Sequence, residues 1–244
     1  MKNIVGLLPV RLESSRLPGK ALKDIEGMPA IIHAYKRASL SKMLQDVYIC
    51  TDSKDIIEVA SQYGCKVIET GNHRNGTERI NEAVGQINAD IVINIQGDEV
   101  LVNPQHIDSI AATMLDSSPD YCLGVTPFEK FNSPQDFKAV LDLSGNMIFC
   151  SRSDIPNQSI NDGELLKVVF IVGFTKASLK QFIEWPETPL ERAEPNEFLR
   201  IIEHGYKIKT VKLDSAKISL DTESDLKEIR ELMKNDSIYP MYRS

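Results

Sequence analysis

Short apolar segments alternate with amphipathic segments through the first half of this chain of 244 residues, and this alternation restricts the fold more than any other feature. The apolar segments are typical of buried strands, and the amphipathic ones are typical of helices. We predict strands at Ile4–Leu8, Asp46–Thr51, Lys66–Glu69 and Asp90–Ile95, and helices at Pro29–Lys42, Lys54–Tyr63, Gly76–Gln86 and Pro104–Leu115. Such crossovers join parallel strands, so the pattern predicts an α/β fold with a mostly parallel central sheet and helices on both faces.

The pattern changes near Tyr121, where β-like segments follow one another with turn residues between them. We predict strands at Tyr121–Phe128, Lys138–Leu143, Met147–Cys150 and Lys167–Phe174, helices at Ser178–Glu184 and Glu191–His204, a strand at Lys207–Val211 and a helix at Glu223–Lys234. The polar stretch Asn157–Glu164 is expected to be an exposed loop. The β-like part is either an inserted antiparallel ribbon or an extension of the same sheet. Because no clear linker is visible, we predict one domain over 1–244 with a β-rich elaboration at about 121–185.

The composition restricts the classes of partner. A formal net charge of −7 argues against nucleic-acid binding, because a phosphate backbone is bound by clustered cations. Apolar runs such as Val168–Phe174 are far shorter than the roughly 20 residues that span a bilayer, so no membrane partner is expected. No signal peptide is visible, and the four cysteines are too widely spaced for a zinc site. These features favour a cytoplasmic protein with reduced thiols.

Three cations stand in the loop that follows the first predicted strand. Arg11, Arg16 and Lys20 are spaced along a segment that also contains proline and glycine. Guanidinium groups bind phosphate oxygens in pairs, and a lysine adds a compact point charge. The segment has neither the G-x-G-x-x-G nor the G-x-x-x-x-G-K-[ST] pattern, so hydride transfer and ATPase activity have little support. The loop therefore predicts a polyphosphate site.

Carboxylates follow two other predicted strands. Asp98 lies in Gln96-Gly97-Asp98-Glu99, just after the strand that ends at Ile95, and ligands in such sheets bind at the carboxyl ends of strands. There Asp98 would hold Mg²⁺ against a phosphate, or it would only cap the next helix or turn. Asp221-Thr222 precedes the last predicted helix, and a helix cap is the simpler interpretation of either residue. Acting together, the two aspartates would share a metal that bridges a nucleotide and a second substrate.

Two further segments carry candidate binding groups. Thr77 and Arg79 begin a predicted helix, whose amides and guanidinium group would favour an anion or recognise a base. A plain helix cap is an equally good interpretation of Thr77. Arg152 follows a predicted strand, and it would bind a substrate carboxylate or be an ordinary surface cation.

Together these segments resemble the sugar-acid cytidylyltransferases, specifically the CMP-Kdo synthetase family (3-deoxy-manno-octulosonate cytidylyltransferases). The matching segments, in the order of the family, are Pro9–Lys20, Thr51-Asp52, Gly76–Arg79, Asn94–Glu99, Ser151-Arg152 with Ile155-Pro156, Pro189–Glu191, Gly205 with Lys207-Ile208, and Asp221-Thr222. The resemblance spans nearly the whole chain. It implies a Rossmann-like sheet of the nucleotide-diphospho-sugar transferase type, a homodimer, and a role in making lipopolysaccharide or capsule.

The resemblance also implies an enzyme that transfers CMP from CTP to the anomeric hydroxyl of a sugar acid, with Mg²⁺ as cofactor and pyrophosphate as the second product. The implied catalytic residues are Arg11, Arg16, Lys20, Asp98 and Asp221, and the metal ligands among them are Asp98 and Asp221. The implied nucleotide-binding residues are Pro9, Arg11, Ser14, Lys20, Thr51, Thr77, Arg79, Gln96 and Asp98. The expected partners are therefore CTP and a sugar acid.

The sugar half departs from the pattern of the family. Where the family has a His-x-Gly-x-Tyr-Gly-Tyr-like strand, Val168 stands in place of the histidine and Val172 in place of the first tyrosine. In the Glu-Gln-Leu-Arg segment, which begins here at Glu197, Phe198 replaces the polar amide. The candidate sugar-binding residues are these four and Arg152. An unpaired buried polar atom costs roughly 1–3 kcal/mol, so the predicted acceptor is Kdo or a modified, less polar 3-deoxy-ulosonic acid.

Two alternatives stay open at this point. One is a nucleotidyltransferase that uses a different acceptor or a different base. The other is a catalytically silent homologue that binds a nucleotide and serves as a regulatory or assembly partner. The pair Asp98 and Asp221 argues against the silent homologue, because a protein that only binds nucleotide has less need of two metal carboxylates.

Overall fold

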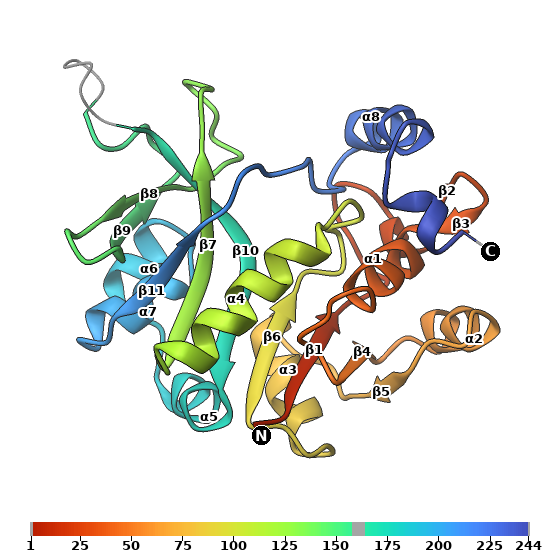
Figure 1. Ribbon diagram of the computed structural model, residues 1–244, viewed down its shortest axis with the longest axis horizontal. Coiled ribbons are helices and arrows are strands. Elements are labelled where there is room, and N and C mark those ends of the chain that lie inside the picture. Colours follow the sequence, from red (N-terminus) through yellow and green to blue (C-terminus); the bar gives the residue numbers. More distant parts are fainter. Residues whose placement is uncertain (1, 158–163, 244) are drawn as a thin grey trace.

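The computed structural model describes residues 2–157 and 164–243, so most of the loop predicted at Asn157–Glu164 lies outside the described residues. Within these ranges, nine strands form one sheet in the order β5-β4-β1-β6-β10-β7-β11-β9-β8 (Figure 1). Helices cover both faces of this sheet, and the predicted α/β class is confirmed. The β-like segments of the second half continue the sheet of the first half, so they are an extension of it and not a separate ribbon.

The first half of the chain supplies the parallel part of the sheet. Its strands are β1 (Ile4–Pro9), β4 (Asp46–Thr51), β5 (Val67–Glu69) and β6 (Ile91–Ile95), and its helices are α1 (Ala30–Ala38), α2 (Lys54–Gln62) and α3 (Gly76–Val84). β1 pairs in parallel with β4 on one side and β6 on the other. Helix α1 does not extend to Lys42 as predicted, because the carboxylate of Asp108 accepts hydrogen bonds from the backbone of Lys42 (2.9 Å) and Met43 (3.1 Å).

The second half makes the sheet mixed instead of mostly parallel. Its strands are β7 (Tyr121–Pro127), β8 (Lys138–Leu141), β9 (Asn146–Ser151), β10 (Leu166–Thr175) and β11 (Ile208–Lys212). β10 lies between β6 and β7 and is antiparallel to both, whereas β7 and β11 are parallel. The described residues between β7 and β10 contain no helix, and neighbouring parallel strands need a crossover of helical length. β10 therefore enters the sheet in the opposite direction.

The helices of the second half are α4 (Pro104–Asp116), α5 (Lys176–Glu184), α6 (Pro189–Ala193), α7 (Phe198–Glu203) and α8 (Glu223–Lys234). A small hairpin of β2 (Asp24–Ile25) and β3 (Met28–Pro29) and two 3₁₀ turns, Lys20–Leu22 and Tyr239–Met241, complete the described elements. The predicted helix Glu191–His204 is divided into α6 and α7. Pro195 has no backbone donor, and the side chain of Asn196 accepts a hydrogen bond from the amide of Phe198 (3.0 Å), which starts α7 as a separate helix.

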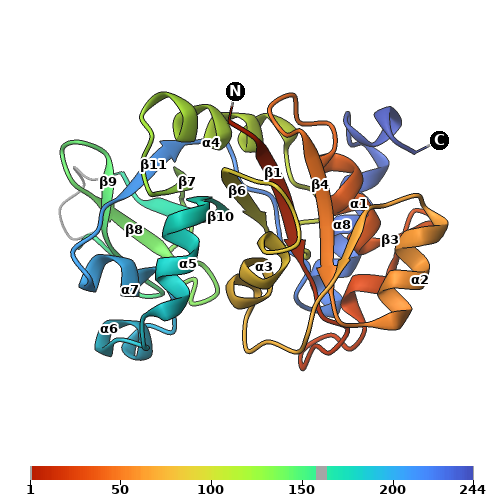
Figure 2. The same cartoon turned by 90° about the horizontal axis from the view of Figure 1, so that it is seen from below.

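Apolar side chains on the two faces of the sheet form two main cores. One face packs against α1, α2 and α4, and the other packs against α3, α5 and α7. Figure 2 shows α4 on one side of β6 and β10, with α3 and α5 on the other side. The strand β6 contributes Ile91, Ile93 and Ile95 to the first core and Val92 to the second. This alternation follows from the period of two along a strand. The loops that follow the carboxyl ends of β1 and β6 carry polar residues.

A buried arginine joins α8 to the rest of the molecule. Arg37 of α1 is 1% exposed and forms an ion pair with Asp236, which follows α8. It also donates hydrogen bonds to the carbonyl of Val102 (3.2 Å) and to the hydroxyl of Tyr242 (3.2 Å). Although burial opposes it, the hydrogen bond from Arg37 lowers the pKa of Asp236. Since α8 begins next to Asp221, this contact fixes one end of a helix whose other end belongs to a candidate site.

We expect Arg37→Met to lower the free energy of unfolding by about 3–5 kcal/mol, because it leaves the partly buried carboxylate of Asp236 without its cation. Urea unfolding followed by circular dichroism measures this loss. The double variant Arg37→Met/Asp236→Leu should recover a large part of it, since no unpaired charge remains. A loss below about 1 kcal/mol in the single variant would show that the ion pair does not stabilise the fold.

Candidate active site

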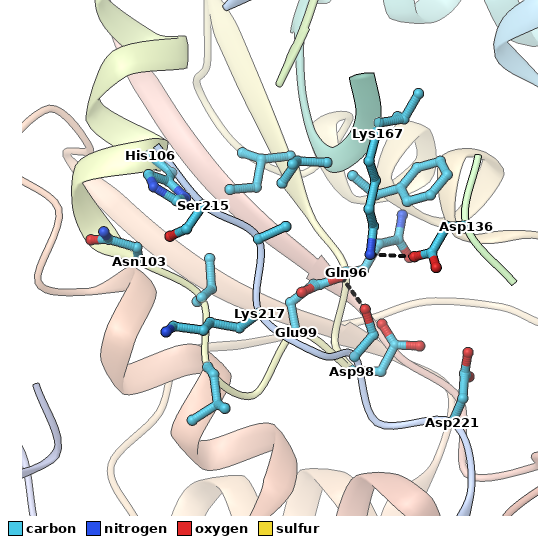
Figure 3. Close-up of a pocket in the computed structure, with 18 of the residues that line it drawn as sticks. Gln96, Asp98, Glu99, Asn103, His106, Asp136, Lys167, Ser215, Lys217 and Asp221 are labelled. Carbon is cyan, nitrogen blue, oxygen red and sulfur yellow. Dashed lines mark hydrogen bonds and ion pairs between the residues drawn. The ribbon is translucent and has the colours of Figure 1, made fainter. Parts of the chain in front are cut away.

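Two cavities open at the carboxyl ends of β1 and β6. The smaller cavity, of about 390 Å³, is lined mainly by the loop after β1 and by the start of α3. The larger cavity, of about 740 Å³, is lined by residues of the β-rich half and by the segment between β11 and α8. Gln96, Asp98 and Asp221 line both cavities, and Figure 3 places these residues at one end of the larger one. The two cavities therefore meet at the two aspartates singled out in the sequence.

The loop after β1 is held by an apolar anchor and a glycine turn. Leu17 is buried in a small core with Leu220 and Leu226. Gly19 has a φ of 65°, which glycine adopts without strain, and it turns the chain into the 3₁₀ turn that begins at Lys20. The smaller cavity is lined by Pro9, Arg11, Ser14, Arg16 and Lys20 of this region. The predicted cationic loop thus faces a cavity that is accessible to a ligand.

Lys20 lies between the two aspartates. Its Nζ is 2.6 Å from Oδ2 of Asp98 and 3.0 Å from Oδ1 of Asp221. Burial by itself lowers the pKa of Lys20, but the ion pairs and hydrogen bonds with both carboxylates outweigh burial and raise it. Arg16 adds a third cation, since its guanidinium is 3.0 Å from the same oxygen of Asp221. Three segments that are far apart in the sequence thus converge on one point.

The contacts of Asp221 and Thr222 show which of the two residues caps α8 and which one faces the cavity junction. The hydroxyl of Thr222 accepts a hydrogen bond from the amide of Asp225 (3.2 Å), and the carboxylate of Asp225 accepts one from the amide of Thr222 (2.7 Å). This reciprocal pair caps α8. Thr222 is therefore the helix cap, and the Asp221 carboxylate faces Lys20 instead. The carboxylate of Asp98 likewise contacts Lys20.

Glu99 connects the two aspartate loops, and the sequence did not single it out. Its carboxyl group accepts a hydrogen bond from the hydroxyl of Ser219 (2.6 Å), while the amide of Leu220 donates to the carbonyl of Asp98 (3.0 Å). Burial, and next the charge of Asp98, raise the pKa of Glu99 to about 7. The segment that carries Asp221 is thus tied to the loop that carries Asp98 at two places.

Arg79 lines the smaller cavity, but its guanidinium group already binds other side chains of the protein. Its guanidinium is 3.2 Å from the carboxylate of Asp52 and 2.6 Å from the hydroxyl of Thr70. Two other predicted nucleotide-binding residues, Thr51 and Thr77, are fully buried and line neither cavity. The side chain of Asn75, not that of Thr77, caps α3.

Four of the five candidate sugar-binding residues line the larger cavity: Arg152, Val168, Glu197 and Phe198. The guanidinium of Arg152 donates to the carbonyls of Pro134 (2.6 Å) and Gln135 (3.1 Å). Glu197 accepts a hydrogen bond from Thr77, and its second oxygen is buried without a hydrogen-bond partner among the described residues.

Val172 does not reach either cavity. It is completely buried and pairs with Asn94 across β10 and β6, so its side chain is part of the core on the α3 face. Both polar atoms of the Asn94 side chain are buried without a hydrogen-bond partner among the described residues. A side chain at position 172 therefore affects a ligand only through the packing of the sheet beneath it.

Several residues of the larger cavity were not predicted. Lys167 and Asp136 form an ion pair inside it, and Figure 3 shows them facing each other. Phe170 also lines the cavity, and it stands where the family strand has its glycine. A phenylalanine at a glycine position was a visible signal in the sequence. The partnership of Lys167 with Asp136 was not, because the two residues lie on separate segments.

The family model described as Cytidylyltransferase matches residues 5–210. The 3-deoxy-manno-octulosonate cytidylyltransferase of Koribacter versatilis is 34% identical to this chain over 236 residues, which cover 95% of the chain and 90% of the relative. The protein of the same name from a Nitratiruptor species is 37% identical over 233 residues, which cover 91% and 97% of the two proteins. The chain belongs to the cytidylyltransferase family.

A solved structure supports the same relationship. The structure of CMP:2-keto-3-deoxy-manno-octonic acid synthetase complexed with CTP matches this fold with a TM-score of 0.92 at 31% identity, and the match covers 96% of this chain and 99% of that one. The predicted resemblance to the CMP-Kdo synthetases is therefore confirmed.

Neither a preformed metal cluster nor a membrane span is present in the described part of the chain. Residues 2–157 and 164–243 include no group of three or more His, Cys, Asp or Glu side chains arranged to hold a metal ion. No described helix has the length and apolar character needed to cross a membrane.

The environment of Glu197 predicts how the stability of the protein depends on pH. Burial raises the pKa of Glu197 from 4.5 to about 7, although the hydrogen bond from Thr77 opposes this. The folded protein therefore holds this proton more tightly than the unfolded chain, and the stability from protonated Glu197 is lost as the pH rises from about 4.5 through about 7. We expect Glu197→Gln, which stays neutral, to gain stability relative to the natural chain across this window.

Urea unfolding at several pH values between about 5 and 8 measures this difference. It should increase with pH in favour of Glu197→Gln and level off above the window. The exposed Glu184→Gln variant serves as the matched control, and its stability should follow that of the natural chain at every pH. A difference for Glu197→Gln that does not change with pH would contradict the raised pKa.

Proposed function

We propose that this chain transfers CMP from CTP to the anomeric hydroxyl of Kdo or a closely related 3-deoxy-ulosonic acid, with release of pyrophosphate. The observation that carries the proposal is the junction of two cavities at Asp98 and Asp221. One cavity is bordered by cations suited to a triphosphate, and the other is large enough for a sugar acid. The family to which the chain belongs supports the same reaction.

In this proposal, CTP occupies the smaller cavity. Arg11 and Arg16 are exposed on its wall, and their guanidinium groups bind the phosphate oxygens of the nucleotide. Pro9, Ser14 and Gln96 line the same cavity and shape the nucleotide site. Arg79, Thr51 and Thr77 act indirectly, by supporting the backbone around it.

Lys20 changes its partner when substrate binds. Without substrate, its ammonium group neutralises Asp98 and Asp221. A triphosphate in the smaller cavity offers stronger negative charge, so Lys20 moves to a phosphate oxygen. There it stabilises the charge that develops on the leaving pyrophosphate.

The donor set at the junction fits Mg²⁺. Asp98 and Asp221 converge on one ammonium nitrogen, so their oxygens already surround a position where a cation is stable. Mg²⁺ in phosphate-transfer sites is held by one or two carboxylates together with phosphate and water oxygens, and these two residues would hold it here. When bound, the ion supplies Lewis acidity that polarises the α-phosphate.

The acceptor occupies the larger cavity. In the reaction, its anomeric oxygen forms a bond to the α-phosphorus, the bond from that phosphorus to the bridging oxygen breaks, and pyrophosphate leaves. The hydroxyl proton is released to water. Arg152, which lines this cavity, binds the carboxylate of the acceptor. The homodimer and the cytoplasmic location stay predictions.

Pyrophosphate release with CTP, Mg²⁺ and Kdo tests the proposal. We expect Asp221→Asn and Asp98→Asn to lower kcat at least about a hundredfold, because each removes a charge that would hold the metal at the reacting phosphate. The exposed Glu223→Gln variant, at the first turn of α8, should keep the natural kcat.

Competition among the four nucleoside triphosphates tests the base, and CTP should be preferred. Binding of CTP without pyrophosphate release for any 3-deoxy-ulosonic acid would contradict the proposed function and favour a silent homologue. Equal kcat values for Asp221→Asn and the natural chain would contradict the role of the carboxylate pair.

Ser219 is expected to act as a positioning residue for Asp221. Ser219→Ala removes the hydroxyl that donates a hydrogen bond to Glu99, so the segment carrying Asp221 loses one of its two hydrogen-bonded connections to the Asp98 loop. We expect kcat to fall about tenfold while the dissociation constant of CTP stays nearly unchanged, since Ser219 does not line the smaller cavity. Ser219→Thr keeps the hydroxyl and should restore most of kcat. A tenfold loss in both variants would indicate a packing effect instead.

A further inference from the structure

Three phenylalanine rings form one continuous aromatic surface in the larger cavity. Phe170 of β10 and Phe198 of α7 are stacked, with ring centres 6.1 Å apart and an angle of 30° between the rings. Phe137 meets Phe170 edge to face, with ring centres 5.9 Å apart. All three residues line the larger cavity. We call this surface of Phe137, Phe170 and Phe198 the phenylalanine platform.

The fold holds the platform in place. The register between β10 and β7 shifts between Val169 and Val172, so Phe170 lies in an irregular part of the strand. Phe198 starts α7 and is fixed by the hydrogen bond from its amide to Asn196. The guanidinium of Arg152 lies 4.2 Å from the centre of the Phe137 ring and covers it. The platform is therefore built before any ligand binds.

Phe170 is the part of the platform that a ligand can touch. Phe137 and Phe198 are only 5% and 2% exposed, whereas Phe170 is partly exposed to the cavity. Val168, which stands in place of the histidine of the family strand, adds another apolar group to the same cavity. The side chains of Val168 and of the platform offer no hydrogen bond to a substrate hydroxyl.

The rings of Phe170 and Phe198 stand at two positions where this chain differs from the family pattern. In the family patterns described above, position 170 is a glycine and position 198 is a polar amide, and here both are phenylalanine. The two positions are far apart in the sequence, yet their rings stack on one another. One replacement alone would leave a gap or an unpaired polar group, but together they close the wall with apolar surface.

Some polar side chains of the cavity are already engaged by other groups of the protein. Lys167 is paired with Asp136, and Arg152 donates to two carbonyl groups. One oxygen of Glu197 and the side-chain nitrogen of Asn196 lack a hydrogen-bond partner among the described residues, but both atoms are buried. The cavity can therefore satisfy fewer hydroxyl groups than a cavity with the family's histidine and amide. A hydroxyl placed against the platform would lose its hydrogen bonds to water without replacement.

From this juxtaposition we propose that the phenylalanine platform selects an acceptor that presents an apolar alkyl group, such as a methyl group, where Kdo presents a hydroxyl. The inference rests on the proposed function and specifies the substrate class of the same site. C–H groups of a sugar pack well on an aromatic face. Hydrophobic pockets discriminate against an added hydroxyl by about a hundredfold at most, so the preference is measurable while Kdo stays a slow substrate.

The test compares kcat/KM for three acceptors in the presence of CTP and Mg²⁺, with the rate measured as pyrophosphate release. The acceptors are Kdo, a Kdo analogue whose terminal hydroxymethyl group is a methyl group, and an analogue with a methoxy group in place of a side-chain hydroxyl. We expect at least one analogue to exceed Kdo by about tenfold or more. Phe198→Gln, which returns the amide, should shift the ratio toward Kdo by about tenfold, and Phe170→Gly should shift it in the same direction.

Phe131→Gln is the matched control, because Phe131 is 58% exposed and lines neither cavity. Its acceptor ratio should equal that of the natural chain. The dissociation constant of CTP, measured by calorimetry, should be unchanged in all three variants, which shows that they are folded.

A natural chain that prefers Kdo over both analogues overturns the inference. So does a ratio that Phe198→Gln and Phe170→Gly leave unchanged while CTP still binds. Absence of turnover with every acceptor, in a protein that binds CTP, overturns the proposed function itself and the inference with it.

Discussion

Lys20 holds together the three parts of the chain on which the cavity junction depends. Its ammonium group contacts Asp98, which follows β6, and Asp221, which precedes α8. Two carboxylates that approach the same point repel each other, and the cation between them offsets this repulsion in the site without substrate. Lys20 supplies it from within the chain, and the same side chain can then be exchanged for the charges of substrate and metal.

The parallel half of the sheet follows from local features of the sequence. The strands ending at Pro9, Thr51 and Ile95 are short and apolar, and each is followed by an amphipathic helix, so periodicity identified them closely. The direction of β10 did not follow from its residues, because an apolar segment such as Val168–Phe174 pairs equally well in either direction. The break before Phe198 depends on a side-chain cap by Asn196, which helical periodicity does not reveal.

The candidate site was also only partly predictable from the sequence. The cavity-lining positions Arg11, Lys20 and Asp98 were recognised because each follows a strand end, where the topology gathers ligand-binding groups. Contacts between distant segments were not recognisable. Glu99 with Ser219 and Lys167 with Asp136 are pairs that only the fold brings together. Val172 was assigned to the sugar site from its place in a motif, but it lies farther along β10, opposite Asn94, and its side chain is completely buried in the core on the α3 face.

The late position of Asp221 has a consequence for the synthesis of the protein. Lys20 and Asp221 are separated by 201 positions, and chains leave the ribosome from the N-terminus at about 5–20 residues per second. The first strands can pair while translation continues, yet the second carboxylate is still missing. A nascent chain therefore displays its cationic loop for some seconds before α8 arrives, and a product of premature termination keeps the cations without the residue that completes the junction.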